Sequence, residues 1–193
     1  MSTSLSIQPA RGDSTSDAVT TYFEQLARVP LLTREGEVEL AKRIEEGERR
    51  ALRAIIASSI GARELGLIGR SLRERKLRLR DVTRATVDEE AGDDEDSAAR
   101  AIGEALERAG SAARAGRAPA RTRDELVEAL LEIRLARRAF DCVVSKLRAT
   151  REGAPLPRRR TVDATLAAIR TGEAKAEHAK SDLIAANLRL VVS

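Results

Sequence analysis

Few residues in this 193-residue chain are of the types that perform chemistry. His178 is the only histidine, and its Ala, Lys and Glu neighbours favour a solvated helix surface. Cys142 is the only cysteine, and its neighbours Val143 and Val144 favour a buried, inert thiol. A zinc site of the usual kind needs more His or Cys ligands than these, so we expect none.

Two further kinds of site can be compared with the sequence. No glycine-rich loop followed by Lys-Ser or Lys-Thr is present, and the scattered glycines do not have the dinucleotide-binding spacing. Asp93, Asp94 and Asp96 supply enough charge for a calcium loop, but the later Gly and Glu of such a loop are missing. We therefore expect no cofactor, no metal, no small-molecule substrate and no enzymatic activity.

The composition predicts an all-α fold. Aromatic residues make up only 2% of the chain, whereas Ala, Leu, Arg and Glu are abundant, and such side chains lose little rotamer freedom in a helix. No run approaches the ~20 apolar residues that cross a bilayer, so we expect no membrane partner. A lone cysteine fits a reducing compartment, and we expect a cytoplasmic protein. The net charge of +4 is too small to indicate nucleic acid by itself.

The elements expected from the patterning form an irregular helical domain with one long helix, an acidic loop and a disordered N-terminal tail. The tail covers residues 1–16, which are rich in Ser, Thr and Gly. A first helix follows and ends before Pro30. Thr33 is a plausible cap for a second helix, which Gly47 either ends or continues. Its expected apolar face is Val38, Ala41 and Ile44.

The middle of the chain, 48–171, is expected to be a variable helical insert. Residues 48–60 predict a helix with Leu52, Ile55 and Ile56 inward, and 65–84 predict short helices interrupted by glycines. Residues 88–96 hold seven acids in nine positions, and we expect a solvated loop, with a DNA-mimicking or autoinhibitory role as the alternative. An Ala-rich helix is expected over 97–114.

The long helix is expected to begin at a capping box of Thr122 and Glu125 and to run to about residue 150. Its single apolar face comprises Leu126, Leu130, Ile133, Phe140, Val144 and Leu147. Two more helices are expected, over 161–170 and 173–193. The last one has an inner surface of Ala176, Ala179, Leu183, Leu190 and Val191.

Two segments go beyond generic helix. The first, 17–47, contains Tyr22, Pro30-Leu31-Leu32-Thr33, Glu35-Gly36-Glu37 and Ala41-Lys42-Arg43-Ile44. The second, 172–193, contains Gly172-Glu173-Ala174-Lys175, Ala179-Lys180 and Ala186-Asn187-Leu188-Arg189-Leu190-Val191. Together they resemble bacterial RNA polymerase sigma factors of the sigma-70 family, primary type, with the first segment similar to region 1.2 and the second to the start of region 2.1.

The resemblance implies a partner and a process. Sigma factors bind core RNA polymerase, direct it to promoter DNA and help to open the duplex. In the family, region 1.2 contacts the single-stranded non-template strand just downstream of the minus-ten element. Regions 1.2 and 2.1 together form a pocket for the flipped last thymine of that element. Matched position by position, this pocket would use Leu31, Glu37, Asn187, Leu190 and Ser193.

The chemistry of these residue types suits a flipped base. Asn187 can donate and accept hydrogen bonds, Glu37 can accept them, and Leu31 and Leu190 can sandwich a ring or simply pack between helices. The resemblance also places Tyr22 and Phe23 towards the single strand, where Phe23 could stack on a base, and we expect one of the two in the helix core instead. Glu24 departs from the family pattern, because its carboxylate would repel a phosphate.

The chain ends inside the region 2.1-like segment, before the parts that carry the main polymerase contact and read the minus-ten element. We therefore expect the N-terminal fragment of a sigma factor. The alternative is a truncated, sigma-like helical module that binds a protein partner without reading promoters.

Overall fold

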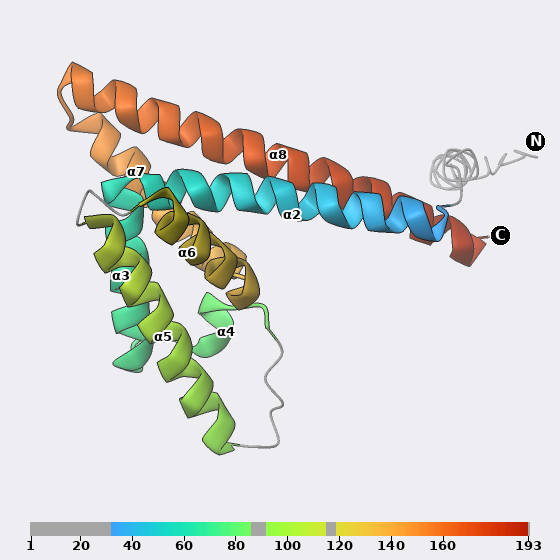
Figure 1. Cartoon of the computed structure of the whole chain (residues 1–193), viewed down its shortest axis with the longest axis horizontal. Coiled ribbons are helices and arrows are strands. Elements are labelled where there is room, and N and C mark those ends of the chain that lie inside the picture. Colours follow the sequence, from blue (N-terminus) through green and yellow to red (C-terminus); the bar gives the residue numbers. More distant parts are fainter. Residues whose placement is uncertain (1–31, 86–91, 115–118, 193) are drawn as a thin grey trace, which may run out of the picture. The chain divides into compact units, whose positions relative to one another are not determined.

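The computed structural model describes residues 32–85, 92–114 and 119–192, and within these ranges the chain is helical with no strand (Figure 1). The all-α prediction is confirmed. The predicted tail over 1–16 and the helix before Pro30 lie outside the described residues. The described helices are α2 (Arg34–Ala57), α3 (Ser59–Arg73), α4 (Leu79–Val82), α5 (Gly92–Arg114), α6 (Ala120–Ile133), α7 (Arg137–Glu152) and α8 (Leu156–Val192).

The chain divides into two compact units. Among the described residues, one comprises 32–41 and 178–192, and the other comprises 42–85, 92–114 and 119–177. Both α2 and α8 contribute residues to each unit. The larger unit has its own hydrophobic core, to which each of its long helices contributes. The largest fully buried side chains of this core include Ile55, Leu65, Leu72, Leu106, Leu130, Leu147 and Ile169.

Helix α2 begins as predicted and ends later than predicted. The Thr33 hydroxyl accepts a hydrogen bond from the Gly36 amide at 3.2 Å, which confirms the predicted cap. Gly47 continues the helix, so the separate helix expected over 48–60 is wrong. The break comes at Ser58, whose hydroxyl accepts from the Gly61 amide and caps α3. Leu52, Ile55 and Ile56 are buried, as predicted.

The expected apolar face near the start of α2 is wrong. Val38 and Ala41 are exposed and Ile44 is only half-buried, whereas Leu40, Gly47 and Ala51 are buried. The difference arises because α8 approaches α2 closely at Gly47 and Ala51. A Cβ on Gly47 would lie 2.6 Å from the Gly172 carbonyl oxygen, so this line of α2 faces a neighbouring backbone.

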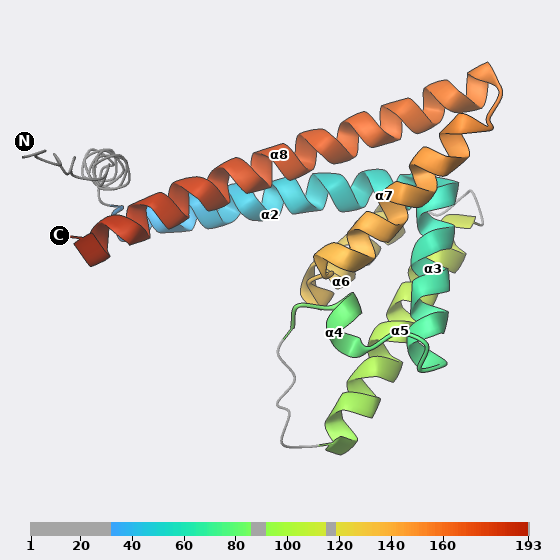
Figure 2. The ribbon, with the colours of Figure 1, turned by 180° about the vertical axis from the view of Figure 1, so that it is seen from behind.

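Glycines also lie at the contact between α3 and α5, and these two helices run alongside each other in both views (Figures 1 and 2). The interruptions expected at the glycines are wrong, because α3 runs without a break through Gly61, Gly66 and Gly69, whereas the short α4 is in line with the short helices expected over 65–84. A Cβ on Gly69 would lie 2.5 Å from the Gly103 carbonyl oxygen. The glycines therefore allow two helix backbones to approach closely and do not interrupt the helix.

Helix α5 begins at Gly92, so the loop expected over 88–96 is wrong for its second half, while residues 86–91 lie outside the described residues. Acidic residues in the first turns of a helix are stabilised by the partial positive charge of its N-terminus. An acidic run that would be expected to stay in a loop because of its own charge repulsion can therefore form the start of a helix.

The long helix expected over 122–150 is two helices. Arg134, with φ 51° and ψ 63°, adopts the left-handed conformation and ends α6. The buried Thr83 stabilises the break between the two helices. Its hydroxyl donates a hydrogen bond to the Ile133 carbonyl, and its backbone forms an isolated antiparallel bridge with Leu135. The predicted apolar face passes from Ile133 to Phe140 without an apolar residue at the intervening turn, where Arg137 stands.

The predicted capping box is also wrong. Pro119 precedes the first residue of α6, and its carbonyl accepts a hydrogen bond from the Arg123 amide. Thr122 lies inside the first turn, and Glu125 forms an ion pair with Arg121 at 3.1 Å.

Helix α8 is the longest described helix, with 37 residues, and replaces the two helices expected over 161–170 and 173–193. Pro157 lies in its first turn, where a missing amide hydrogen costs nothing. Gly172 is buried, and a Cβ there would lie 2.6 Å from the Gly47 carbonyl oxygen. Ala176 and Ala179 are buried as predicted, and Leu183 is half-buried. The side chains of Leu190 and Val191 lie outside the described residues.

Candidate nucleic-acid interface

The smaller unit pairs the start of α2 with the end of α8. Residues 34–41 and 178–192 lie side by side and antiparallel in both views (Figures 1 and 2). These segments are more than 130 residues apart in the sequence. The fold thus brings the end of the region 1.2-like segment next to the region 2.1-like segment.

The first turn of α2 is defined by local contacts. The Thr33 hydroxyl and carbonyl accept from the amides of Gly36 and Glu37, at 3.2 and 2.9 Å. Leu32 folds back over this turn, since a Cβ on Gly36 would lie 3.1 Å from the Leu32 Cδ2 atom. Glu35 and Glu37 both lie in the first turn, where the helix dipole favours a carboxylate.

Helical geometry predicts that Glu37 and Asn187 lie on the same side of this helix pair. Glu37 precedes the buried Leu40 by three residues, and Asn187 follows the buried Ala186 by one. At 3.6 residues per turn these offsets are about 60° and about 100° of rotation in the same sense. In an antiparallel pair, equal rotation away from the facing side leads to the same flank. Both residues are exposed, so their polar groups are available to a ligand on that flank.

The other predicted site residues cannot be placed in this way. Tyr22, Phe23, Leu31 and Ser193 lie outside the described residues. Leu190 is helical, but its side chain is also outside them. Of the predicted set, the structure therefore locates Glu37 and Asn187, and it places them in one unit.

The smaller unit also exposes apolar side chains that the sequence analysis did not assign to a site. Val38 on α2 is 47% exposed, and Ile184 and Leu188 on α8 are 58% and 37% exposed. Ile184 and Leu188 are four residues apart and share a face of α8, away from the buried Ala179 and Ala186. The sequence could have indicated this face, because α8 carries a second apolar pair, Ile184 and Leu188, besides the residues of its buried side.

The two residues with the most reactive side chains are Cys142 on α7, in the larger unit, and His178 on α8, in the smaller unit. His178 is exposed, as predicted, and its Nδ1 lies 3.1 Å from Asp182. Cys142 is exposed, so the predicted burial is wrong. Its Sγ lies 3.8 Å from the Glu64 carboxylate, and partial desolvation together with this negative charge raises the pKa of the thiol. Such a thiol is a poor nucleophile at neutral pH.

Within the described ranges, no group of three or more His, Cys, Asp or Glu side chains could hold a metal ion. No helix in the same ranges is both long enough and apolar enough to cross a membrane.

Residues 17–50 match the family model for the sigma-70 factor, region 1.2. The matched segment ends inside α2 and includes Thr33 and Glu37. This part of the chain is therefore similar to sigma-70 region 1.2, which supports a relation to the sigma-70 family.

Proposed function

We propose that this chain acts as the N-terminal part of a primary-type RNA polymerase sigma factor. It takes part in promoter-directed initiation by binding core polymerase and contacting the melted non-template strand. The proposal rests on the match of residues 17–50 and on the pairing of that segment with the end of α8 in one compact unit. No catalytic step belongs to it.

In this proposal, Glu37 and Asn187 read the edge of a flipped thymine from the flank of the helix pair that they share. A base that is already unpaired costs little to evert, so a few hydrogen bonds are enough to select it. Both groups are exposed in the free chain, which leaves them able to bind when DNA is presented by the polymerase. The remaining members of the set, Leu31, Leu190 and Ser193, would complete the pocket.

The test uses the full chain with bacterial core polymerase and a fluorescent non-template oligonucleotide that contains the minus-ten element. Asn187→Ala should weaken oligonucleotide binding by about tenfold, the scale of one well-placed hydrogen-bonding contact to a base. The loss should shrink to about twofold or less when the last thymine is replaced by an abasic site, because Asn187 then has no base to read.

Ser181→Ala is the matched control, because Ser181 is an exposed polar residue of α8 that is not in the proposed pocket. Equal losses for Asn187→Ala on the intact and abasic oligonucleotides would reject the pocket.

The second candidate, a helical protein-interaction module without promoter reading, is favoured by the exposed Ile184 and Leu188. It predicts binding to core polymerase that is unaffected by oligonucleotide, with no dependence on the final thymine.

A further inference from the structure

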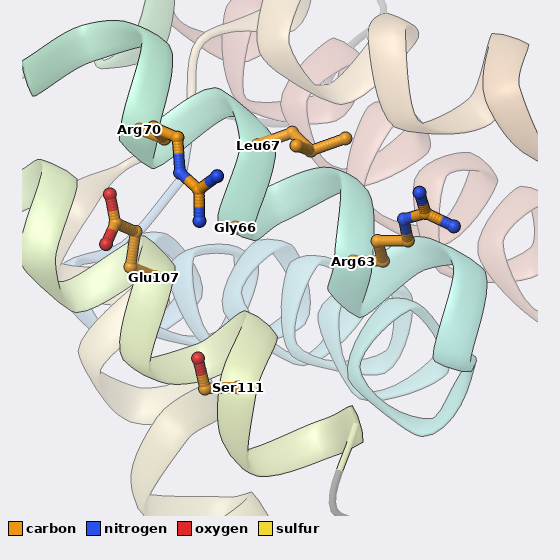
Figure 3. Close-up of a pocket in the computed structure, with 6 residues that line it drawn as sticks. All are labelled: Arg63, Gly66, Leu67, Arg70, Glu107 and Ser111. Atoms are coloured by element: carbon orange, nitrogen blue, oxygen red, sulfur yellow. The ribbon is translucent and has the colours of Figure 1, made fainter. Parts of the chain in front are cut away.

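A second surface, on the larger unit, carries features that the proposed function does not use. Two adjoining grooves lie on either side of α3. The first, of about 190 Å³, lies between α3 and α5 and is lined by Arg63, Leu67 and Arg70 together with Glu107 and Ser111 (Figure 3). Arg63 and Leu67 project from α3 at one edge of this groove and also line the next one.

The second groove, of about 350 Å³, extends from α3 to α7 and the start of α8. Besides Arg63 and Leu67, it is lined by Lys146 and Thr150 of α7 and by Arg158 of α8. Because two side chains belong to both grooves, the grooves form one continuous surface. We call this surface the α3 groove, and its cationic residues are Arg63, Arg70, Lys146 and Arg158.

The charge of the α3 groove is largely uncompensated. Neither Arg63 nor Arg158 forms an ion pair with another described residue. Four basic side chains line the groove against two acids, Glu64 and Glu107, and Glu107 is already paired with Arg73 at 3.0 Å. The centre of the surface is apolar, since Leu67 is 41% exposed there.

The residues of α3 that line the groove are spaced so that a partner helix could contact all of them. Arg63, Leu67 and Arg70 occupy positions i, i+4 and i+7, so they form one stripe with a charge at each end and an apolar residue between. The two arginines are separated by about 10 Å along the axis at 1.5 Å per residue. A helix with acidic residues seven positions apart and a leucine between them presents the complementary stripe.

Nucleic acid fits this surface less well. Single strands are held by aromatic side chains on which bases stack, and the lining of the α3 groove contains none. An exposed leucine between the cations instead favours an amphipathic polypeptide, because apolar contact at the centre and charge at the rim are typical of protein interfaces.

We propose that the α3 groove is a docking site for an acidic amphipathic helix of a protein partner. Arg63, Arg70, Lys146 and Arg158 bind its carboxylates, and Leu67 packs against its apolar residue. The proposal is independent of the region 1.2-like segment, since every residue that lines the groove lies between residues 59 and 158, beyond the matched residues 17–50.

The probe is a fluorescent, helix-forming peptide of about 18 residues with Glu at positions seven apart and Leu between them, and a scrambled peptide of the same composition serves for comparison. With the full chain at about 0.15 M salt, where long-range fields are screened beyond about 8 Å, the ordered peptide should bind at least about fivefold more tightly than the scrambled one. The double variant Arg63→Glu/Arg158→Glu should weaken its binding by about tenfold, and Leu67→Ser by about threefold.

The matched control is Arg100→Glu/Arg148→Glu, which reverses two exposed charges outside the groove and changes the net charge equally. It should alter peptide binding by less than about twofold, and circular dichroism melting checks that all variants remain folded. Equal losses in both double variants, or equal binding of the two peptides, would overturn the proposal. Tighter binding of a DNA duplex or single strand, lost in Arg63→Glu/Arg158→Glu, would overturn it in favour of a nucleic-acid surface.

Discussion

Single residues set the chemical character of this chain, and Cys142 shows how. The residue is exposed, but partial desolvation of the thiol disfavours the thiolate. The neighbouring Glu64 carboxylate acts in the same direction, and the pKa of the thiol is raised. The fold thus favours the neutral thiol: the resulting contribution to stability is complete below the pKa of the unfolded chain and is lost as the pH rises through the folded-state pKa.

Alkylation of Cys142 should therefore be slow at neutral pH. We expect the rate of iodoacetamide modification to rise with a midpoint pH above that of the same chain unfolded in urea, because less thiolate is present in the folded chain at a given pH. Glu64→Gln should move the midpoint down by removing the like charge. Glu104→Gln, at an exposed position on α5, should leave it unchanged. Coincident profiles for folded and unfolded chains would contradict this account.

Helix pairing in the larger unit depends on glycines that meet a neighbouring backbone. Alanine ordinarily stabilises a helix by about 1 kcal/mol relative to glycine. At Gly69 this preference is opposed, because a Cβ would lie 2.5 Å from the Gly103 carbonyl oxygen and 2.8 Å from the Leu106 Cβ. At Gly66, three residues earlier on the same helix, the nearest atom is the Gly110 Cα at 3.4 Å, an ordinary contact.

The two glycines should consequently respond to alanine with opposite signs. Gly69→Ala should lower the free energy of unfolding by about 1–3 kcal/mol, the usual cost of overpacking, since α5 would have to move away. Gly66→Ala should raise it by about 0.5–1 kcal/mol through helix propensity. Urea denaturation measures both changes. Stabilisation by Gly69→Ala would mean that α3 and α5 are not in close contact.

At the scale of the whole molecule, the two units differ in how much apolar surface they bury. Among the described residues, the smaller unit buries Leu40, Ala179 and Ala186, two of which are alanines. The larger unit buries a continuous cluster of leucine, isoleucine and valine side chains from α2 through α8. Local opening needs less free energy where fewer large side chains are buried.

Hydrogen exchange should therefore vary along α8. Amide hydrogens of residues 178–189 should exchange at least about tenfold faster than those of 162–177, which corresponds to a difference of about 1.4 kcal/mol in opening free energy. Under the proposed function, core polymerase and the oligonucleotide together should slow exchange in 178–189. Uniform protection along α8 in the free chain would contradict the expected difference.

Much of this molecule was predictable from sequence because helix propensity and capping are local. The all-α class follows from composition, the start of α2 from Thr33, and the inward positions of Leu52, Ile55 and Ile56 from periodicity. The family resemblance also rests on local motifs, and the match of residues 17–50 agrees with it. The roles of Glu37 and Asn187 remain predictions, carried by that resemblance and by their shared flank.

Only the tertiary structure decided where helices end and which glycines they tolerate. Gly47 and Gly172 look like helix breakers, but each is buried where α2 and α8 approach closely. Arg134 looks like a helix former, yet it is left-handed because the buried Thr83 binds the end of α6. In both cases the deciding contact joins residues that are far apart in the sequence, so its energy does not appear in any local window.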